Sequence, residues 1–98
     1  MTFEINYLIK PVGYLQRGIG VRVDLQGAAS DVYLTDDSGL SRLQRGDLDG
    51  FLRSSYGGHY TASPVVLGAP STGRWNVVVI PIQGEVRLIN VSPVRIAA

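Results

Sequence analysis

The sequence predicts an all-β protein: a single antiparallel β-sandwich, or a jelly-roll-like barrel, with one short helical excursion near residues 38–46. Three observations support this prediction. Short segments alternate apolar and polar side chains, turn-forming residues interrupt them roughly every eight to twelve positions, and no long segment has a helical repeat. A chain of 98 residues is long enough for one hydrophobic core, so we expect one β-sandwich domain spanning residues 1–98.

The expected strands are the segments in which apolar and polar residues alternate: residues 2–9, 20–26, 31–35, 59–67, 74–82 and 85–96. The first strand is expected to end at Pro11-Val12-Gly13, and the turn that follows carries Tyr14 and Leu15 as candidates for burial. A slip in the alternation at Leu88-Ile89 predicts either a β-bulge in the last segment or a strand that changes sheets there.

Residues 20–26 have the most regular alternation. Val21, Val23 and Leu25 share one face, and the residues between them are polar, which is typical of an antiparallel sheet with one face in solvent. Only four residues separate this segment from residues 31–35, which is too few for a parallel crossover. We therefore expect the two segments to pair as antiparallel neighbours.

The helical excursion is predicted by leucines at helical spacing after the third strand. They indicate one or two helical turns from Ser38 to Gln44, with Asp37 or Ser38 as the N-cap residue. Gly46 and Gly50 are expected to stop these helical turns. Phe51-Leu52 would then either begin another short strand or anchor the excursion to the core.

The segment 74–82 holds the single Trp of the chain and is apolar on both faces. One face carries Trp75, Val77 and Val79, and the other carries Val78 and Ile80. A strand of this kind is expected at the centre of a sheet that is covered on both sides. Pro81 lacks an amide hydrogen, so pairing is expected to end there. The alternation also predicts that Trp75 lies in the core rather than forming an exposed stacking platform.

Composition argues against several classes of function. The net charge of +1 is too small for a nucleic-acid partner. The absence of cysteine excludes disulfides, thiolate metal sites and a cysteine nucleophile, and it favours the cytoplasm. Residues 1–4 lack the basic start of a signal peptide. The longest apolar run, Val77–Ile82, is far shorter than the roughly 20 residues that span a bilayer, so we expect no membrane partner.

Several short motifs together cover nearly the whole chain: Gly13-Tyr14-Leu15 with Gly18, Val21-x-Val23-x-Leu25, Asp31-Val32-x-Leu34-x-Asp36, Tyr56-Gly57-Gly58, Ser63-Pro64, Pro70-x-x-Gly73-x-Trp75, Val77-Val78-Val79 and Val86-Arg87. In order and spacing they resemble a bacterial family known only as the domain of unknown function 1883. The resemblance implies a small all-β domain, found alone or joined to modules such as TIR (Toll/interleukin-receptor) signalling domains. It implies no activity, cofactor or catalytic residue. This chain departs from the family at Ile80, where relatives often have an acidic residue.

The best candidates for a ligand site are the consecutive residues Tyr56, Gly57, Gly58, His59 and Tyr60, with Arg53 nearby. Two glycines let a ligand approach the backbone closely, and the tyrosines and the imidazole can stack on it and hydrogen-bond to it. Such a loop would hold a sugar ring, a base or a peptide. The alternative is that the glycines only mark the start of a strand and that the tyrosines pack against it.

Three other chemistries have weaker patterns. His59 would act as a general base for a serine at position 54, 55 or 63, but the chain has no Gly-x-Ser-x-Gly elbow. Asp47-Leu48-Asp49-Gly50 is similar to a calcium loop, although its glycine comes too early for an EF-hand. Arg42, Arg45 and Arg53 would suit a phosphate or an acidic partner, or simply form a solvated face. With one His and no Cys, no metal site is expected.

We therefore predict a small non-enzymatic module in the cytoplasm that needs no cofactor. It would present the Gly57-Gly58 loop and the Asp36–Gly50 excursion to a ligand or a protein partner. The alternative is a self-association domain that forms a homodimer through the apolar strand face of Val77–Ile82. A third hypothesis is a His-dependent hydrolase, which requires a carboxylate or hydroxyl within about 7 Å of His59.

Overall fold

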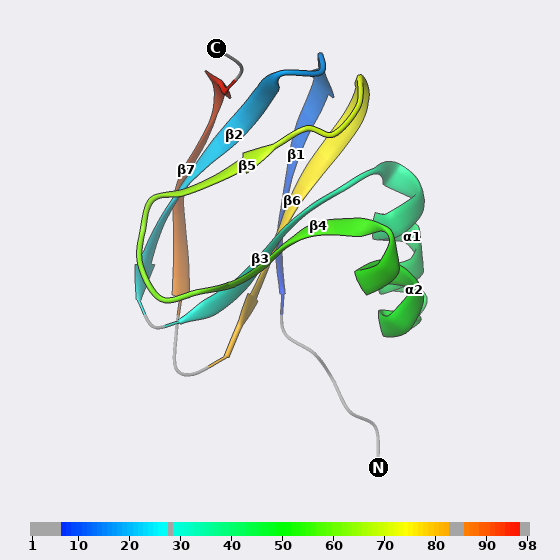
Figure 1. The fold of residues 1–98 in the computed structure, drawn as a ribbon. Coiled ribbons are helices and arrows are strands. Elements are labelled where there is room, and N and C mark those ends of the chain that lie inside the picture. Colours follow the sequence, from blue (N-terminus) through cyan, green and yellow to red (C-terminus); the bar gives the residue numbers. More distant parts are fainter. Residues whose placement is uncertain (1–6, 28, 83–85, 97–98) are drawn as a thin grey trace.

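The computed structural model describes residues 7–27, 29–82 and 86–96, and within them the chain is mostly β, as predicted. Its elements, in chain order, are β1 Leu8–Leu15, β2 Ile19–Gly27, β3 Ser30–Thr35, α1 Asp37–Gln44, α2 Leu48–Arg53, β4 Ser55–Tyr60, β5 Val65–Gly68, β6 Gly73–Pro81 and β7 Val86–Arg95. The strands form two antiparallel sheets (Figure 1). The four-stranded sheet has the order β1-β6-β3-β4, and the three-stranded sheet has the order β5-β2-β7.

Apolar side chains of both sheets join one buried cluster. Its buried members are Leu15, Val21, Val23, Val32, Leu34, Val65, Leu67, Ala69, Trp75, Val77, Val79 and Val86. They come from alternate positions of the strands, because successive side chains of a strand point to opposite faces. Complete burial of one valine side chain contributes about 1.5 kcal/mol or more, so this shared cluster is a main source of stability.

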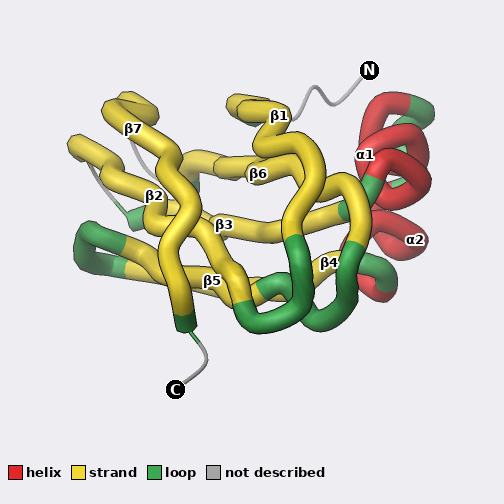
Figure 2. The backbone as a smooth tube through the Cα atoms, turned by 90° about the horizontal axis from the view of Figure 1, so that it is seen from above, coloured by secondary structure: helices red, strands yellow, loops and turns green. Residues whose placement is uncertain are grey.

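The two helices cover the other face of the four-stranded sheet, away from β2, β5 and β7 (Figures 1 and 2). Leu43 of α1, Phe51 of α2 and Val78 of β6 form a second buried cluster. The ring of Tyr33 on β3 meets Phe51 edge-on, with centroids 5.4 Å apart. β6 is thus a central strand buried on both faces and ends at Pro81, as predicted. No helix in the described part of the chain is long and apolar enough to cross a membrane.

α1 confirms the predicted helix, but its N-cap residue is Asp36 rather than Asp37 or Ser38. Oδ1 of Asp36 accepts a hydrogen bond from the Gly39 amide at 2.7 Å. This bond satisfies one of the amide groups that a helix leaves unpaired in its first turn.

α2 corrects the prediction for the end of the excursion. Gly50 does not stop a helix but lies inside α2, and Phe51-Leu52 are helical rather than the start of a strand. The reason is a second cap: Oδ1 of Asp47 accepts a hydrogen bond from the Gly50 amide at 3.0 Å. Complete burial of the Phe51 side chain then holds this short helix on the sheet.

β1 also differs from the predicted first strand. Residues 2–6 of that prediction lie outside the described residues. Pro11 and Gly13 lie inside β1 instead of ending it, and the register with β6 shifts between them. Because β1 is an edge strand, it tolerates a proline without an amide hydrogen and a bulge. Leu15 is buried as predicted, whereas Tyr14 is exposed.

The predicted pairing of residues 20–26 with residues 31–35 was wrong. β2 pairs antiparallel with β5 and β7, whereas β3 pairs antiparallel with β4 and β6 in the other sheet. The short connection therefore crosses between the sheets instead of closing a hairpin. The apolar faces of β2 and β3 still contribute to one buried cluster. Two strands can pack their apolar faces together when they lie in opposite sheets, not only when they are neighbours in one sheet.

The predicted strand 59–67 is in fact parts of two strands in different sheets. β4 ends at Tyr60 and pairs with β3, whereas β5 begins at Val65 and pairs with β2. Pro64 lies between them, and a proline interrupts a ladder because it has no amide hydrogen to donate.

The predicted bulge in the last strand is confirmed. β7 is one strand in which Asn90 pairs with Asp24 and Leu88 pairs with Leu25. Residue 89 is therefore the extra residue that shifts the register.

Candidate functional site

The segment predicted to bind a ligand is an edge strand rather than a loop. β4 is the outermost strand of the four-stranded sheet, and Arg53, the last residue of α2, precedes it. Gly57 has a φ of 149°, and a Cβ there would collide with the carbonyl oxygen of Val32. Its backbone therefore requires glycine. A Cβ on Gly58 would meet no atom within 4 Å. That this segment binds a ligand stays a prediction.

Strand alternation places the predicted residues on opposite faces of β4. Tyr60 packs against the shared cluster, and Tyr56 meets the Trp75 ring edge-on, with centroids 5.9 Å apart. His59 lies on the other face, where its Nδ1 is 3.1 Å from Oδ1 of Asp31 on β3. The two tyrosines and the imidazole therefore do not converge on one ligand.

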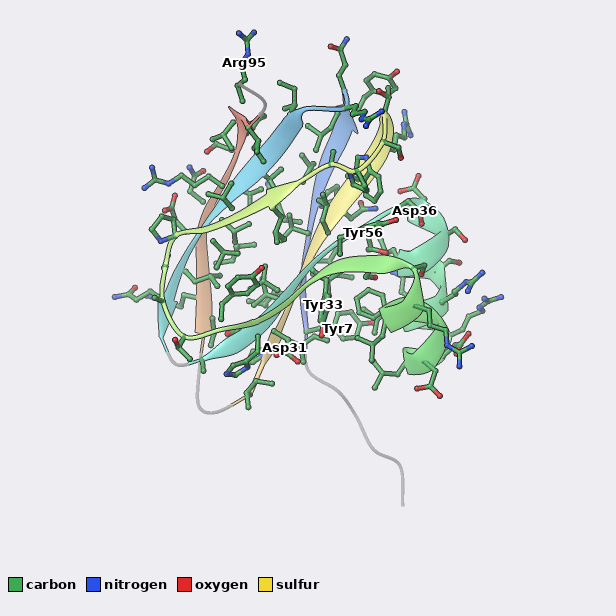
Figure 3. The ribbon with its side chains drawn as sticks, in the orientation of Figure 1. Tyr7, Asp31, Tyr33, Asp36, Tyr56 and Arg95 are labelled. Carbon is green, nitrogen blue, oxygen red and sulfur yellow. The ribbon has the colours of Figure 1, made fainter. Side chains whose placement is uncertain are left out.

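Asp31 lies near two side chains on the helix-covered side of the sheet. Its Oδ1 lies 3.1 Å from Nδ1 of His59, and Tyr33 lies two residues along the same strand, on the same face (Figure 3). Burial, followed by the charge of Asp31, raises the pKa of Tyr33 above its ordinary value of 10.0. The phenol of Tyr33 therefore stays protonated and neutral. The side chain of His59, on the neighbouring strand, is half-exposed.

The serines considered as partners for His59 are bonded elsewhere. The hydroxyls of Ser54 and Ser55 donate to carbonyl oxygens of α2 at 2.8 and 2.6 Å. Oγ of Ser63 accepts a hydrogen bond from a β2 amide at 2.8 Å. Asp31 meets the distance requirement of the hydrolase hypothesis, but none of these serines is placed as a nucleophile.

Several charged residues around the helices lie at helix ends, where they suit the helix dipole or cap the helix. Asp47 of the suggested calcium loop caps α2, and Asp49 lies in the first turn of that helix. Arg42 and Arg53 lie in the last turns of α1 and α2, where a positive charge complements the helix dipole. In the part of the chain that the structure describes, no three His, Cys, Asp or Glu side chains cluster closely enough to hold a metal ion.

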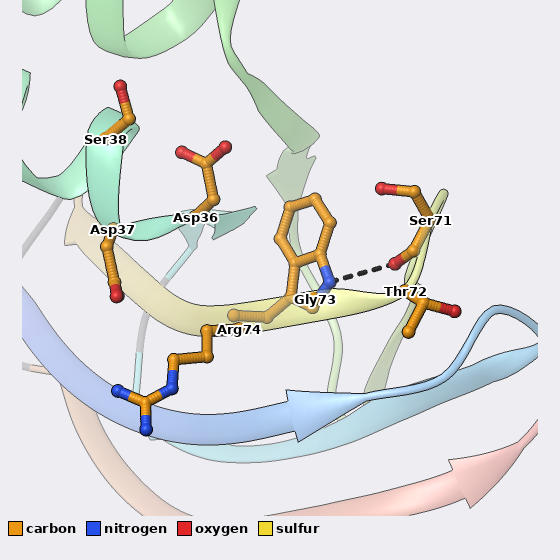
Figure 4. A pocket seen from close by; sticks show the side chains of 8 residues that line it. Asp36, Asp37, Ser38, Ser71, Thr72, Gly73 and Arg74 are labelled. Carbon is orange, nitrogen blue, oxygen red and sulfur yellow. Dashed lines mark hydrogen bonds between the residues drawn. The ribbon is translucent and has the colours of Figure 1, made fainter.

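A cleft of about 340 Å³ opens between the start of α1 and the turn that leads into β6 (Figure 4). It is lined by Asp36, Asp37, Ser38, Ser71, Thr72, Gly73, Arg74 and Trp75. The pairing of β3 with β6 brings these two segments together, because Thr35 at the end of β3 lies opposite Asn76.

Two hydrogen bonds hold the walls of this cleft. The Trp75 indole nitrogen donates to the carbonyl oxygen of Ser71 at 3.1 Å and so folds the turn back onto β6 (Figure 4). The Asn76 amide nitrogen donates to Oδ1 of Asp37 at 3.0 Å and so ties the start of α1 to the same strand. Because α1 and the turn are both fixed to β6, the cleft is built on a rigid element.

The cleft combines acceptors, donors and an aromatic edge. Asp36 and Asp37 each use Oδ1 in a hydrogen bond within the protein, and among the described residues no hydrogen bond to Oδ2 of either carboxylate is found. Arg74 forms no ion pair with any residue that the structure describes, and its side chain points away from Asp36 (Figure 4). Trp75 is only 5% exposed, which confirms its core position, so it offers an edge and not a stacking face.

Neither Arg53 nor any residue of Tyr56–Tyr60 lines this cleft, but three residues of the Asp36–Gly50 excursion, which was also predicted to face a ligand or partner, do so. The sequence showed its parts separately, as an acidic pair before a helix and as a Pro/Gly turn before the Trp-bearing strand. It did not indicate that the two lie together, because that depends on β3 pairing with β6.

Comparisons with protein-family models, with curated proteins and with solved structures found no match to this chain.

Proposed function

We propose that this chain is a small non-enzymatic binding module that holds a neutral, hydroxyl-rich ligand in the cleft between α1 and β6. The observation that carries the proposal is the cleft itself, whose lining includes two aspartates, an arginine, two serines and the indole of Trp75. Its volume of about 340 Å³ lies at the lower end of ligand pockets, which suits a ligand of the size of one sugar ring.

The chemistry of the lining favours hydroxyl groups over charged ligands. A carboxylate oxygen accepts hydrogen bonds from ligand hydroxyls, and Arg74 and Ser71 can donate to ligand oxygens. Two carboxylates repel the phosphates of a nucleotide, and the guanidinium of Arg74 opposes a metal ion. A neutral ligand that both donates and accepts hydrogen bonds therefore fits best.

The proposal includes the finer architecture and setting of the module. We place the cleft on an antiparallel β-sandwich, which the apolar cluster shared by both sheets supports, and we keep the jelly-roll-like arrangement as part of the proposal. We also propose that the protein is cytoplasmic, because its composition is free of cysteine. The motifs quoted above support a proposed relationship to the domain of unknown function 1883.

The single Trp of the chain gives a direct test, because Trp75 lines the cleft. Glucose, galactose and mannose would be titrated while Trp fluorescence and the melting temperature are followed, with AMP and Ca²⁺ as charged probes. A neutral sugar is expected to change both readouts. A ligand at about 100 times its dissociation constant stabilises the fold by about 2.7 kcal/mol.

Two variants and a matched control sharpen this test. Asp37→Asn and Ser71→Ala are expected to weaken the sugar response, since each alters a group that faces the cleft. Ser71→Ala keeps the carbonyl oxygen that binds the indole. Asp49→Asn makes the same chemical change on α2, outside the cleft, and should leave the response unchanged. A response to AMP or Ca²⁺ but to no sugar would contradict the proposal. So would a sugar response that Asp37→Asn and Ser71→Ala retain as fully as Asp49→Asn does.

A His-dependent hydrolase is the second candidate, favoured by the 3.1 Å contact between His59 and Asp31. A carboxylate at Nδ1 is the arrangement that orients a catalytic imidazole. The test is hydrolysis of p-nitrophenyl acetate by the purified protein and by His59→Gln. Equal rates for both proteins would remove this candidate.

A further inference from the structure

Within residues 7–27, 29–82 and 86–96, four strands lie at sheet edges: β1 and β4 in the four-stranded sheet, and β5 and β7 in the three-stranded sheet. An edge strand presents unpaired amide and carbonyl groups to any other extended chain. Proteins usually protect such edges with prolines, bulges, lysines or short strands.

Three of these edges carry such protection. β1 contains Lys10 and Pro11 and has a register shift. β7 contains Pro93 and is bulged at residue 89. β5 has only four residues and directly follows Pro64.

β4 has none of these features. Its six residues include no proline and no lysine, and its register with β3 runs without a shift. Gly57 and Gly58 lie at its centre, and glycine in a strand allows another backbone to approach closely. Tyr56 on the same strand is 49% exposed. β4 is therefore the edge of this fold that is best suited to accept another strand.

We propose that β4 pairs antiparallel with β4 of a second copy of this chain, so that two four-stranded sheets become one continuous sheet. A two-fold axis through Gly57 places Tyr56 of each copy opposite Gly58 of the other, and Ser55 opposite His59. Each bulky side chain then meets a small one, which is the self-complementarity that a two-fold interface requires.

Charge and exposure agree with this occupant. β4 contains no Asp, Glu, Lys or Arg, so two copies meet without like-charge repulsion across the strand pair. The pairing covers the exposed ring of Tyr56 and satisfies the open backbone groups of both copies. Six residues from each copy make a small interface, so the dimer is expected to dissociate on dilution.

Gly58→Lys is the decisive variant. A side chain at Gly58 enters open space in one copy, so the fold should be unchanged, but it meets Tyr56 of the second copy. A lysine on the inner face of an edge strand is also a natural protection against pairing. The matched control is Tyr14→Lys, which places the same charge on β1, the other edge of this sheet, where Tyr14 is 67% exposed.

The measurements are light scattering after size-exclusion chromatography and amide hydrogen exchange. The wild-type mass is expected to rise from 10.6 kDa towards twice that value with concentration, with slower exchange in residues 55–60. Gly58→Lys should remain a monomer with an unchanged circular dichroism spectrum, and Tyr14→Lys should behave as the wild type. A wild-type protein that stays monomeric up to about 1 mM, without concentration-dependent protection of residues 55–60, would overturn the proposal. So would a folded Gly58→Lys variant that dimerises like the wild type.

Discussion

The two sheets differ in how many of their faces are buried. The four-stranded sheet has the shared cluster on one face and the helices on the other, so consecutive residues Val77, Val78 and Val79 of β6 are all buried. Neither of the two helices in the described part of the chain covers the outer face of the three-stranded sheet (Figure 2), which carries Arg22 and Val66 in exposed positions. This difference follows from sequence, because β6 is continuously apolar from Val77 onward, whereas β2 alternates.

The comparison indicates why the proposed sites lie on the four-stranded sheet. Covering both faces of β6 fixes this strand, and the pairing of β3 with β6 then fixes the start of α1 and the turn before Trp75. A binding site needs groups held in place by packed elements. The three-stranded sheet contributes its inner face to the core and leaves the other face to solvent.

The largest effect is expected where the two sheets meet. Trp75→Ala removes a ring that lies in the shared cluster, touches Tyr56 and hydrogen-bonds Ser71. It should lower the free energy of unfolding by about 3–5 kcal/mol, measured by urea denaturation. Trp75→Phe keeps most of the apolar contact but loses the indole N–H, so its cost should be distinctly smaller. Equal costs would mean that ring burial is not the main term.

A matched pair of valines tests the difference between the sheets directly. Val78 on β6 and Val66 on β5 both point away from the shared cluster, but Val78 is fully buried under the helices and Val66 is 52% exposed. Val78→Ala should cost about 1.5–3 kcal/mol. Val66→Ala should stay within about 0.5 kcal/mol. Similar values in thermal or urea unfolding would show that the helices do not stabilise the outer face of the four-stranded sheet.

The same contrast explains which features sequence could predict. The faces of β2 and β6 follow from the period of their own side chains, and so do the core position of Trp75 and the bulge near Leu88. Periodicity does not reveal partners, so the pairing of β2 with β3 was predicted wrongly and the break at Pro64 was missed. The cleft depends on such long-range pairing, which is why its residues could not be assembled from local patterns.

The two helix caps should differ by a smaller amount. Asp36 is partly buried and caps α1 at 2.7 Å, whereas Asp47 is exposed and caps the shorter α2 at 3.0 Å. Replacing an N-cap aspartate with alanine typically costs about 1 kcal/mol. Asp36→Ala should therefore cost at least as much as Asp47→Ala in urea unfolding. The reverse order would indicate that α2, through Phe51, anchors the helical layer.

The smallest effect is expected on the exposed face of the three-stranded sheet. The guanidinium of Arg22 lies 3.2 Å from Oδ1 of Asp24 on the same strand, and the Arg22 side chain is half-exposed. Solvent screens such a pair, so Arg22→Ala should change the free energy of unfolding by less than about 0.5 kcal/mol, and added salt should not change this difference. A loss above about 1 kcal/mol, comparable to that of an N-cap, would mean that this face is packed rather than solvated. Both sheets would then bury two faces, and they would differ only in which residues cover the outer face.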